Sequence, residues 1–413
     1  MISALGRRIL VNTGALTGAN LWRIVVSFAL QLLVARTLGL ESLGHYTVAM
    51  AFLNVSQVLS EVGLPLWLVR RLANAAHHRR AGYMLTLRTQ VVAALIVAAG
   101  LAALTTALPY AAELRTALLW VAASLPFFAV MSATESLFQA GERLELVLAV
   151  EAVTNLLILG LSIGVLRQGG TVAALLEMVL VAQILSAGLA VMLLGRSRLL
   201  AAPQQPLPGR DGLLPAGISP FFGLSLTDVL LQRLDILLLS LVGDARLVGI
   251  YSAAYALVRV IVKLLQSVWR GLYPTLARLH QQNAAQGDRL TRTALRWGGA
   301  ACVVGAALGS GLGPLVTRLV YGVADAEVAE VWAWLVWSAP LFFVELYATT
   351  RLLVMGRARA GLLVSTVHVA LVAALLPGMA AWGGATAAAW AGLIAHGMAA
   401  GLGVVLLRRR GNR

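Results

Sequence analysis

The chain has 413 residues, of which 60% are hydrophobic and only 12% are charged, and its mean hydropathy is +0.85. Soluble domains carry about 25% charged residues, so this composition excludes a soluble protein and predicts an all-α polytopic membrane protein. The net charge is +15, and Lys263 is the only lysine. Because the arginines lie mainly in short loops, we attribute the excess to membrane orientation and expect no nucleic-acid partner.

Twelve apolar stretches are long enough to cross a bilayer as helices, since about 20 residues span its hydrocarbon core. They run approximately over residues 15–36, 45–69, 84–108, 115–138, 145–166, 172–194, 217–241, 247–270, 293–320, 329–353, 360–381 and 385–407. Arginine-rich loops alternate with arginine-poor loops, and both termini are basic. This bias predicts that both termini are cytoplasmic.

The second half of the sequence repeats the first. Leu43-Gly44-His45-Tyr46, after the first span, matches Val248-Gly249-Ile250-Tyr251, after the seventh, at an offset of 205. Pro126 in the fourth span matches Pro340 in the tenth at an offset of 214. Six spans per repeat give both halves the same orientation, so we expect two six-helix bundles related by a parallel pseudo-two-fold axis, with a cavity between them. The expected lobes are residues 1–205 and 206–413, joined by a proline-rich linker at about 195–216.

Polar residues recur at helical spacing inside four of the spans. The first span carries Asn20, Arg23, Ser27 and Gln31, and the second carries Asn54, Gln57 and Glu61. The seventh carries Ser225, Asp228, Gln232 and Asp235, with Arg233 one step around, and the eighth carries Tyr255, Arg259, Lys263, Gln266 and Arg270. A charge at mid-membrane costs about 2.5 kcal/mol or more unless it meets water or a partner. These faces therefore predict an aqueous, mainly cationic cavity.

A cationic cavity suits an anionic cargo, because guanidinium groups bind phosphate oxygens in pairs and lysine adds a point charge. We expect Arg23, Arg259 and Lys263 to face this cavity and to hold an anionic head group, with Asn20, Gln31, Gln57 and Tyr255 lining the same cavity. Small organic anions would also fit such a cavity. Asp235, Glu61 and Asp228 are candidates for coupling to H⁺ or Na⁺, and the sequence leaves open whether any ion is used. Asp235 has a second interpretation, in which it neutralises Arg233 or Arg259.

The sequence gives little support to an enzymatic function or a metal site. The chain has no phosphate-binding GxxxxGK[ST] motif, no HExxH, no nucleophile elbow and no loop long enough for a soluble domain. Its single cysteine, Cys302, excludes an intramolecular disulfide framework and a cysteine-cluster metal site. We expect His368 and His396, inside the last two spans, to be hydrogen-bonded packing residues, with a proton relay as the alternative. The prediction is a transporter that is not an enzyme and has no cofactor or metal.

Three stretches carry a resemblance to a known family. They are LLVARTLGLESLGHYTVAMAF at residues 32–52, FQAGER at residues 138–143 and RLDILLLSLVGDARLVGIYSAAYAL at residues 233–257. They resemble the polysaccharide-biosynthesis flippases of O-antigen type, within the multidrug/oligosaccharidyl-lipid/polysaccharide exporter superfamily. The resemblance implies a V-shaped pair of six-helix bundles, alternating access and export of an undecaprenyl-diphosphate-linked glycan. It also implies that Arg23, Arg259 and Arg233 bind the diphosphate. Lipid II flippases have two further helices, so the twelve spans here argue against that branch.

The sequence thus predicts a flippase that moves a lipid-linked oligosaccharide to the outer leaflet of a bacterial inner membrane for surface polysaccharide assembly. Its expected partners are this lipid-linked substrate, membrane lipids and the glycan polymerase or glycosyltransferases of the same pathway. One alternative is a cation-coupled drug exporter of the same superfamily. The alternatives of another class are a non-transporting membrane scaffold and a membrane glycan polymerase or ligase.

Overall fold

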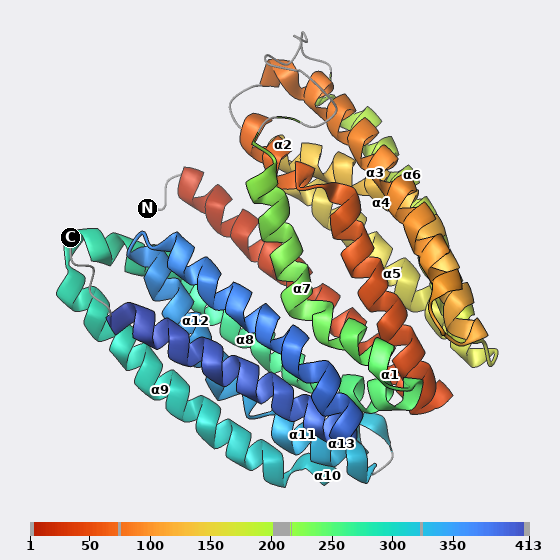
Figure 1. Ribbon diagram of the computed structural model, residues 1–413. Helices are drawn as coiled ribbons and strands as arrows, with labels where there is room; N and C mark the ends of the chain where they lie inside the picture. Colours follow the sequence, from red (N-terminus) through yellow and green to blue (C-terminus); the bar gives the residue numbers. More distant parts are fainter. Residues whose placement is uncertain (1–3, 73–75, 201–214, 216, 323–324, 409–413) are drawn as a thin grey trace. The chain divides into compact units, whose positions relative to one another are not determined.

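The computed structural model is helical throughout the part of the chain that it describes (Figure 1). Residues 1–3, 73–75, 201–214, 216, 323–324 and 409–413 lie outside the described part, and only the backbone is described for residues 4–22, 76, 270 and 284. The predicted linker at about 195–216 falls mostly on residues that are not described. The division into lobes at residue 205 therefore stays a prediction.

Apart from residues 198–218, between α6 and α7, short connections join consecutive helices. Their bounds are α1 Ala4–Glu61, α2 Leu64–Leu72, η1 Ala76–His78, α3 Arg79–Ala107, α4 Ala112–Ala140, α5 Leu144–Arg167, α6 Val172–Ser197, α7 Ser219–Val242, α8 Ala245–Gln282, α9 Ala284–Gly311, α10 Gly313–Tyr321, α11 Ala326–Leu335, α12 Ser338–Val354 and α13 Ala358–Arg408. Among the described residues, eight helices are long and apolar enough to cross a membrane, or nine if α9 and α10, bent by 74°, form one span. This confirms a multi-span all-α membrane protein.

The difference between nine candidate spans and twelve predicted spans has a local cause. α1 and α13 each contain a break, at Gly39 and at Gly383–Gly384, so each holds two of the predicted spans. α7 is 24 residues long but carries three charged side chains, Asp228, Arg233 and Asp235. Each of the twelve predicted spans therefore overlaps a helical segment of the structure.

Some predicted helix limits were wrong. The helix expected over 45–69 is interrupted at Val62 and Gly63, which both have positive φ, 53° and 74°. A side chain at Gly63 would come within 2.5 Å of the backbone nitrogen of Phe222, so glycine permits a close backbone approach there. The span expected over 293–320 is likewise broken at Leu312, and that over 329–353 is split between α11 and α12.

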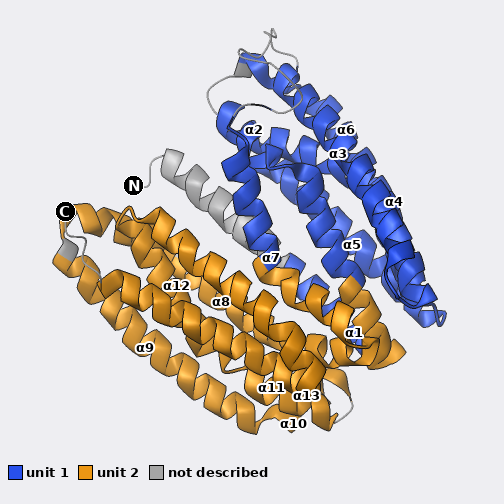
Figure 2. Ribbon diagram, in the orientation of Figure 1, with its two compact units in different colours: residues 1–37, 49–230 blue, residues 38–48, 231–413 orange. Residues whose placement is uncertain are grey.

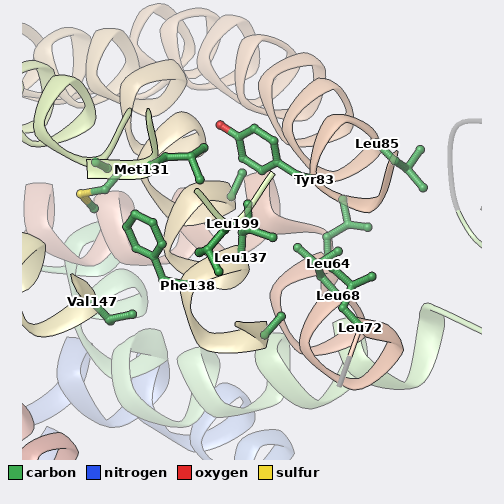
Figure 3. Packing of buried hydrophobic residues seen from close by; sticks show 14 of the residues in the cluster. Leu64, Leu68, Leu72, Tyr83, Leu85, Met131, Leu137, Phe138, Val147 and Leu199 are labelled. Atoms are coloured by element: carbon green, nitrogen blue, oxygen red, sulfur yellow. The ribbon is translucent and has the colours of Figure 1, made fainter. Parts of the chain in front are cut away.

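The structure divides into two compact units, which we describe separately (Figure 2). Unit 1 contains residues 1–37 and 49–230, and unit 2 contains residues 38–48 and 231–413. In unit 1, α4 packs between α3 and α6. A buried apolar cluster includes Leu64 and Leu68 of α2 and Leu137 and Phe138 of α4 (Figure 3). Its residues come from helices α2 to α6, so this core holds these helices of unit 1 together.

In unit 2, α8 packs against α11 and α12, and α12 packs against α13. The indole of Trp269 on α8 lies 5.3 Å from the ring of Phe343 and 5.9 Å from the ring of Tyr347, both on α12. Trp269 and Phe343 are almost fully buried. These aromatic contacts hold α8 in position, and α8 carries the predicted cationic stripe.

The repeat found in the sequence has a structural counterpart inside unit 2, where residues 38–48 cross the start of α8. A side chain at Gly44 would come within 1.8 Å of the carbonyl oxygen of Ala245, and one at Gly249 within 1.8 Å of that of Leu40. Each of these pairs is related to the other by the repeat offset of 205. The hydroxyls of Thr47 and Ser252, also 205 residues apart, hydrogen-bond at 2.9 Å. Equivalent residues of the two repeats thus meet one another, as they do across a two-fold axis.

Candidate anion-binding site

The polar face of α8 is anchored to α7 within unit 2. Asp244 caps the start of α8, because its Oδ1 accepts a hydrogen bond of 2.7 Å from the backbone N–H of Leu247. Further along, Lys263 Nζ donates a hydrogen bond of 3.0 Å to Gln232 Oε1 on α7. The guanidinium of Arg259 lies 6.0 Å from the ring centroid of Tyr255, one turn earlier on α8, in a cation–π contact. The predicted stripe of Tyr255, Arg259 and Lys263 is therefore half-buried beside α7.

α7 adds a second arginine and a carboxylate to this group. Arg233 interacts electrostatically with Arg259 and with Asp235. Asp235 Oδ2 accepts a hydrogen bond of 3.2 Å from the Tyr251 hydroxyl, and Oδ1 accepts one of 2.8 Å from the backbone N–H of Ile236. We call Arg233, Arg259, Lys263 and Asp235 the cationic cluster. It contains three cations and one carboxylate, so its net formal charge is about +2.

Three tyrosines surround the cationic cluster. Tyr46 and Tyr251 are almost fully buried, and Tyr255 is half-buried. The rings of Tyr251 and Tyr255 stack with their centroids 5.8 Å apart. Tyr46 interacts electrostatically with both Arg233 and Arg259. Phenolic hydroxyls both donate and accept hydrogen bonds, so the surroundings of the arginines are polar as well as cationic.

The other predicted site residues belong to unit 1. On α1, Arg23 is exposed, Gln31 is buried and Gln57 is half-buried, while the side chain of Asn20 lies outside the described residues. Asp228 is exposed on the unit 1 portion of α7. The sequence placed Arg23 in one cavity with Arg259, and that placement stays a prediction.

Unit 1 contains an acidic group that the spacing analysis did not assemble. Glu61 Oε1 accepts a hydrogen bond of 2.7 Å from the hydroxyl of Ser132 on α4. Glu135, also on α4, interacts electrostatically with Glu151, with Glu61 and with Arg23. We call Glu61, Glu135 and Glu151 the acidic cluster. It draws on three different helices, so no single helical spacing could reveal it.

A pocket of about 500 Å³ in unit 2 has different chemistry. It is lined by apolar residues of α8, α9 and α12, among them Ile261, Leu265 and Phe343. Ile261 and Leu265 each follow a cation of α8 by two positions, about 200° around the helix, so they lie on the opposite face from Arg259 and Lys263. This pocket offers no charged group to an anion.

A comparison with protein-family models decides the family. The model described as "Polysaccharide biosynthesis protein" matches residues 33–322, which is more than half of the chain. The chain belongs to the polysaccharide biosynthesis protein family. No curated protein is similar enough in sequence to count as a relative.

Solved structures agree with this polysaccharide biosynthesis protein in fold. An inward-facing multidrug resistance MATE family transporter of the MOP superfamily is 12% identical, covers 94% of each chain and has a TM-score of 0.69. The lipid II flippase MurJ, in an inward closed conformation, is 12% identical to this chain. The alignment covers 95% of this chain and 87% of the MurJ chain, with a TM-score of 0.69. A mutant of the Vibrio cholerae MATE transporter VcmN is 14% identical to this chain. The alignment covers 99% of this chain and 98% of the transporter, with a TM-score of 0.60. At these identities the similarity establishes the fold.

The family and the fold together confirm the broad prediction. This polysaccharide biosynthesis protein is a multi-pass membrane protein with the fold of MOP-superfamily transporters. The suspected relationship to the polysaccharide biosynthesis family is therefore confirmed. The roles of individual site residues, the identity of the membrane and the cytoplasmic position of both termini stay predictions.

Proposed function

We propose that this protein is a flippase for a lipid-diphosphate-linked oligosaccharide. The observation that supports the proposal is the cationic cluster, in which Arg233 and Arg259 interact with the single carboxylate of Asp235 and Lys263 lies one turn beyond Arg259 on α8. Two guanidinium groups can bind the paired oxygens of a diphosphate, and charge-assisted hydrogen bonds of this kind contribute about 1.5–3 kcal/mol each. Membership in a polysaccharide biosynthesis family supports a substrate that contains a glycan.

The position of the cluster suits an amphipathic substrate. α8 is a candidate membrane span, and Arg259 and Lys263 lie within it. A head group bound there can carry its glycan on the polar face while its lipid tail stays in the bilayer. Alternating access would then move the head group from the cytoplasmic to the outer leaflet. In this scheme Arg23 would add a further phosphate contact.

Asp235 supports release of the substrate in this scheme. It interacts with both arginines, so it competes with a bound diphosphate for them. A site that binds an anion must also let it go, and a carboxylate inside the cluster lowers its affinity for anions. Glu61 and Asp228 remain candidates for H⁺ or Na⁺ coupling.

The test is a gene deletion followed by rescue. Loss of the protein should make lipid-linked glycan accumulate on the cytoplasmic leaflet. Arg259→Ala should restore export about tenfold less well than the wild-type protein, because at least one charge-assisted contact is lost. Arg246→Ala is the matched control, since Arg246 is on the same helix but exposed and paired with Glu327 at 2.8 Å. No accumulation after deletion would reject the flippase, and full rescue by Arg259→Ala would reject the phosphate role.

A cation-coupled exporter is the second candidate, and the acidic cluster of unit 1 favours it. Glu135 interacts electrostatically with Glu61 and Glu151, and a group of carboxylates attracts organic cations. This function predicts that Glu135→Gln, and not Arg259→Ala, abolishes resistance to cationic drugs. Unchanged drug sensitivity after gene deletion would reject it.

A further inference from the structure

Three titratable side chains outside the cationic cluster meet in the last helices of unit 2. They are Glu345 on α12, His368 before the break in α13 and His396 after it. His368 Nδ1 lies 3.0 Å from both Oε1 and Oε2 of Glu345, and His396 Nδ1 lies 3.0 Å from Oε2. The two imidazole rings are nearly perpendicular, at 89°, with centroids 4.3 Å apart. We call these residues the His–Glu cluster.

The His–Glu cluster is mostly buried, with His396 the most exposed of its three residues. Glu345 is 6% exposed and His368 is 7% exposed, and the ring of Phe342 packs edge-on against His396 at 5.5 Å. Neutral imidazoles can each donate a hydrogen bond to Glu345, but the cluster then still carries one buried negative charge, and a bound cation would neutralise it. Its donor atoms all lie within 4.8 Å of one another, so one cation can contact all three residues.

The type of donor selects the type of cation. Imidazole nitrogen favours zinc and similar divalent transition metals, whereas Na⁺ and Ca²⁺ favour oxygen ligands. Two histidines and a glutamate form a known three-residue zinc set, with bonds of about 2.0–2.2 Å that put neighbouring ligand atoms about 3.3 Å apart in a tetrahedron. The 3.0 Å separations in the cluster are close to that spacing.

The first half of the chain shows that these charges are not required for packing. The register of Pro126 and Pro340 aligns Glu345 with Met131 and His368 with Thr154, both at an offset of 214. Thr154 Oγ1 contacts Met131 Sδ at 3.8 Å and donates a hydrogen bond of 2.7 Å to Ser186, which is 210 residues before His396. The same meeting point of three helices is therefore built from neutral residues in unit 1 and from metal-binding residue types in unit 2.

We propose that Glu345, His368 and His396 form a binding site for one divalent transition-metal ion of the zinc class. The ion would join α12 to both arms of α13, which fold against each other at the break at Gly383–Gly384. Three protein ligands leave a fourth position at the ion for another ligand. This site is separate from the cationic cluster and does not depend on the proposed flippase function.

The experiment measures metal binding to the purified, detergent-solubilised full-length protein. After incubation with Zn²⁺ and desalting, elemental analysis should find about one equivalent of zinc, and Co²⁺ should give the visible absorption of a low-coordinate cobalt site. The triple variant Glu345→Met, His368→Thr and His396→Ser introduces the residues that pack in unit 1 and should bind at least tenfold less metal. His77→Ala is the matched control, because His77 is exposed and outside the cluster, and it should bind like the wild type.

A second variant covers the case in which the triple variant does not fold. Glu345→Gln keeps the size of the side chain and should still lose most of the metal while eluting as a single species in size-exclusion chromatography. The proposal is overturned if the wild-type protein retains no zinc. It is equally overturned if folded variants of the cluster retain as much zinc as the wild type, since the metal then binds elsewhere.

Discussion

Asp235 shows most directly how one residue can set the properties of the cationic cluster. It holds one hydrogen bond from Tyr251 and lies within the electrostatic reach of Arg233 and Arg259. If it competes with a diphosphate for these arginines, Asp235→Asn should increase the affinity for a lipid-diphosphate analogue several-fold and slow its release. Equilibrium binding to the purified protein, together with flipping rates in vesicles, measures both quantities.

The control for that prediction is Glu327→Gln, which removes an exposed carboxylate paired with Arg246 and should change neither quantity. A decrease in affinity with Asp235→Asn would contradict the competition between carboxylate and phosphate. It would show instead that Asp235 holds the arginines in their binding positions.

The residues of the candidate site differed in how well the sequence revealed them. Tyr255, Arg259 and Lys263 were predictable because they share one helix face at spacings of four, and the structure places them beside α7. The acidic cluster and the His–Glu cluster were not, because each draws side chains from three helical segments. Helical periodicity determines which residues of one helix lie together, but only packing determines which helices meet.

At the scale of elements, the crossing of α1 over α8 depends on two glycines. We expect Gly44→Ala and Gly249→Ala to destabilise the protein by about 1–3 kcal/mol each, because the added methyl group would meet a backbone carbonyl that cannot move aside easily. Thermal denaturation in detergent measures the effect. Gly188→Ala in α6 is the control, because nothing lies within 4 Å of the added methyl group.

The control variant Gly188→Ala also has an expected effect on the melting temperature. Alanine favours a helix interior by about 1 kcal/mol relative to glycine, so Gly188→Ala should leave the melting temperature unchanged or raise it slightly. A Gly44→Ala variant that melts like the wild type would show that the crossing helices can separate without cost.

At the scale of the whole molecule, the sequence predicted the class and the family better than the helix ends. Long apolar stretches have one solution in a bilayer, so the all-α architecture and the twelve helical segments followed from composition. The breaks at Gly39 and Gly383–Gly384 and the positive φ at Val62 did not, because backbone breaks depend on contacts with neighbouring helices. Direct sequence similarity was also limited, since the three solved structures compared above are only 12–14% identical.

The reciprocal contact at Gly44 and Gly249 has, within one chain, the symmetry of an interface between identical subunits. Leu40 meets Gly249 while Ala245 meets Gly44, as happens when two copies of one surface touch. This symmetry does not extend to every part of the repeat, since the second half has a glutamate and two histidines where the first has methionine, threonine and serine.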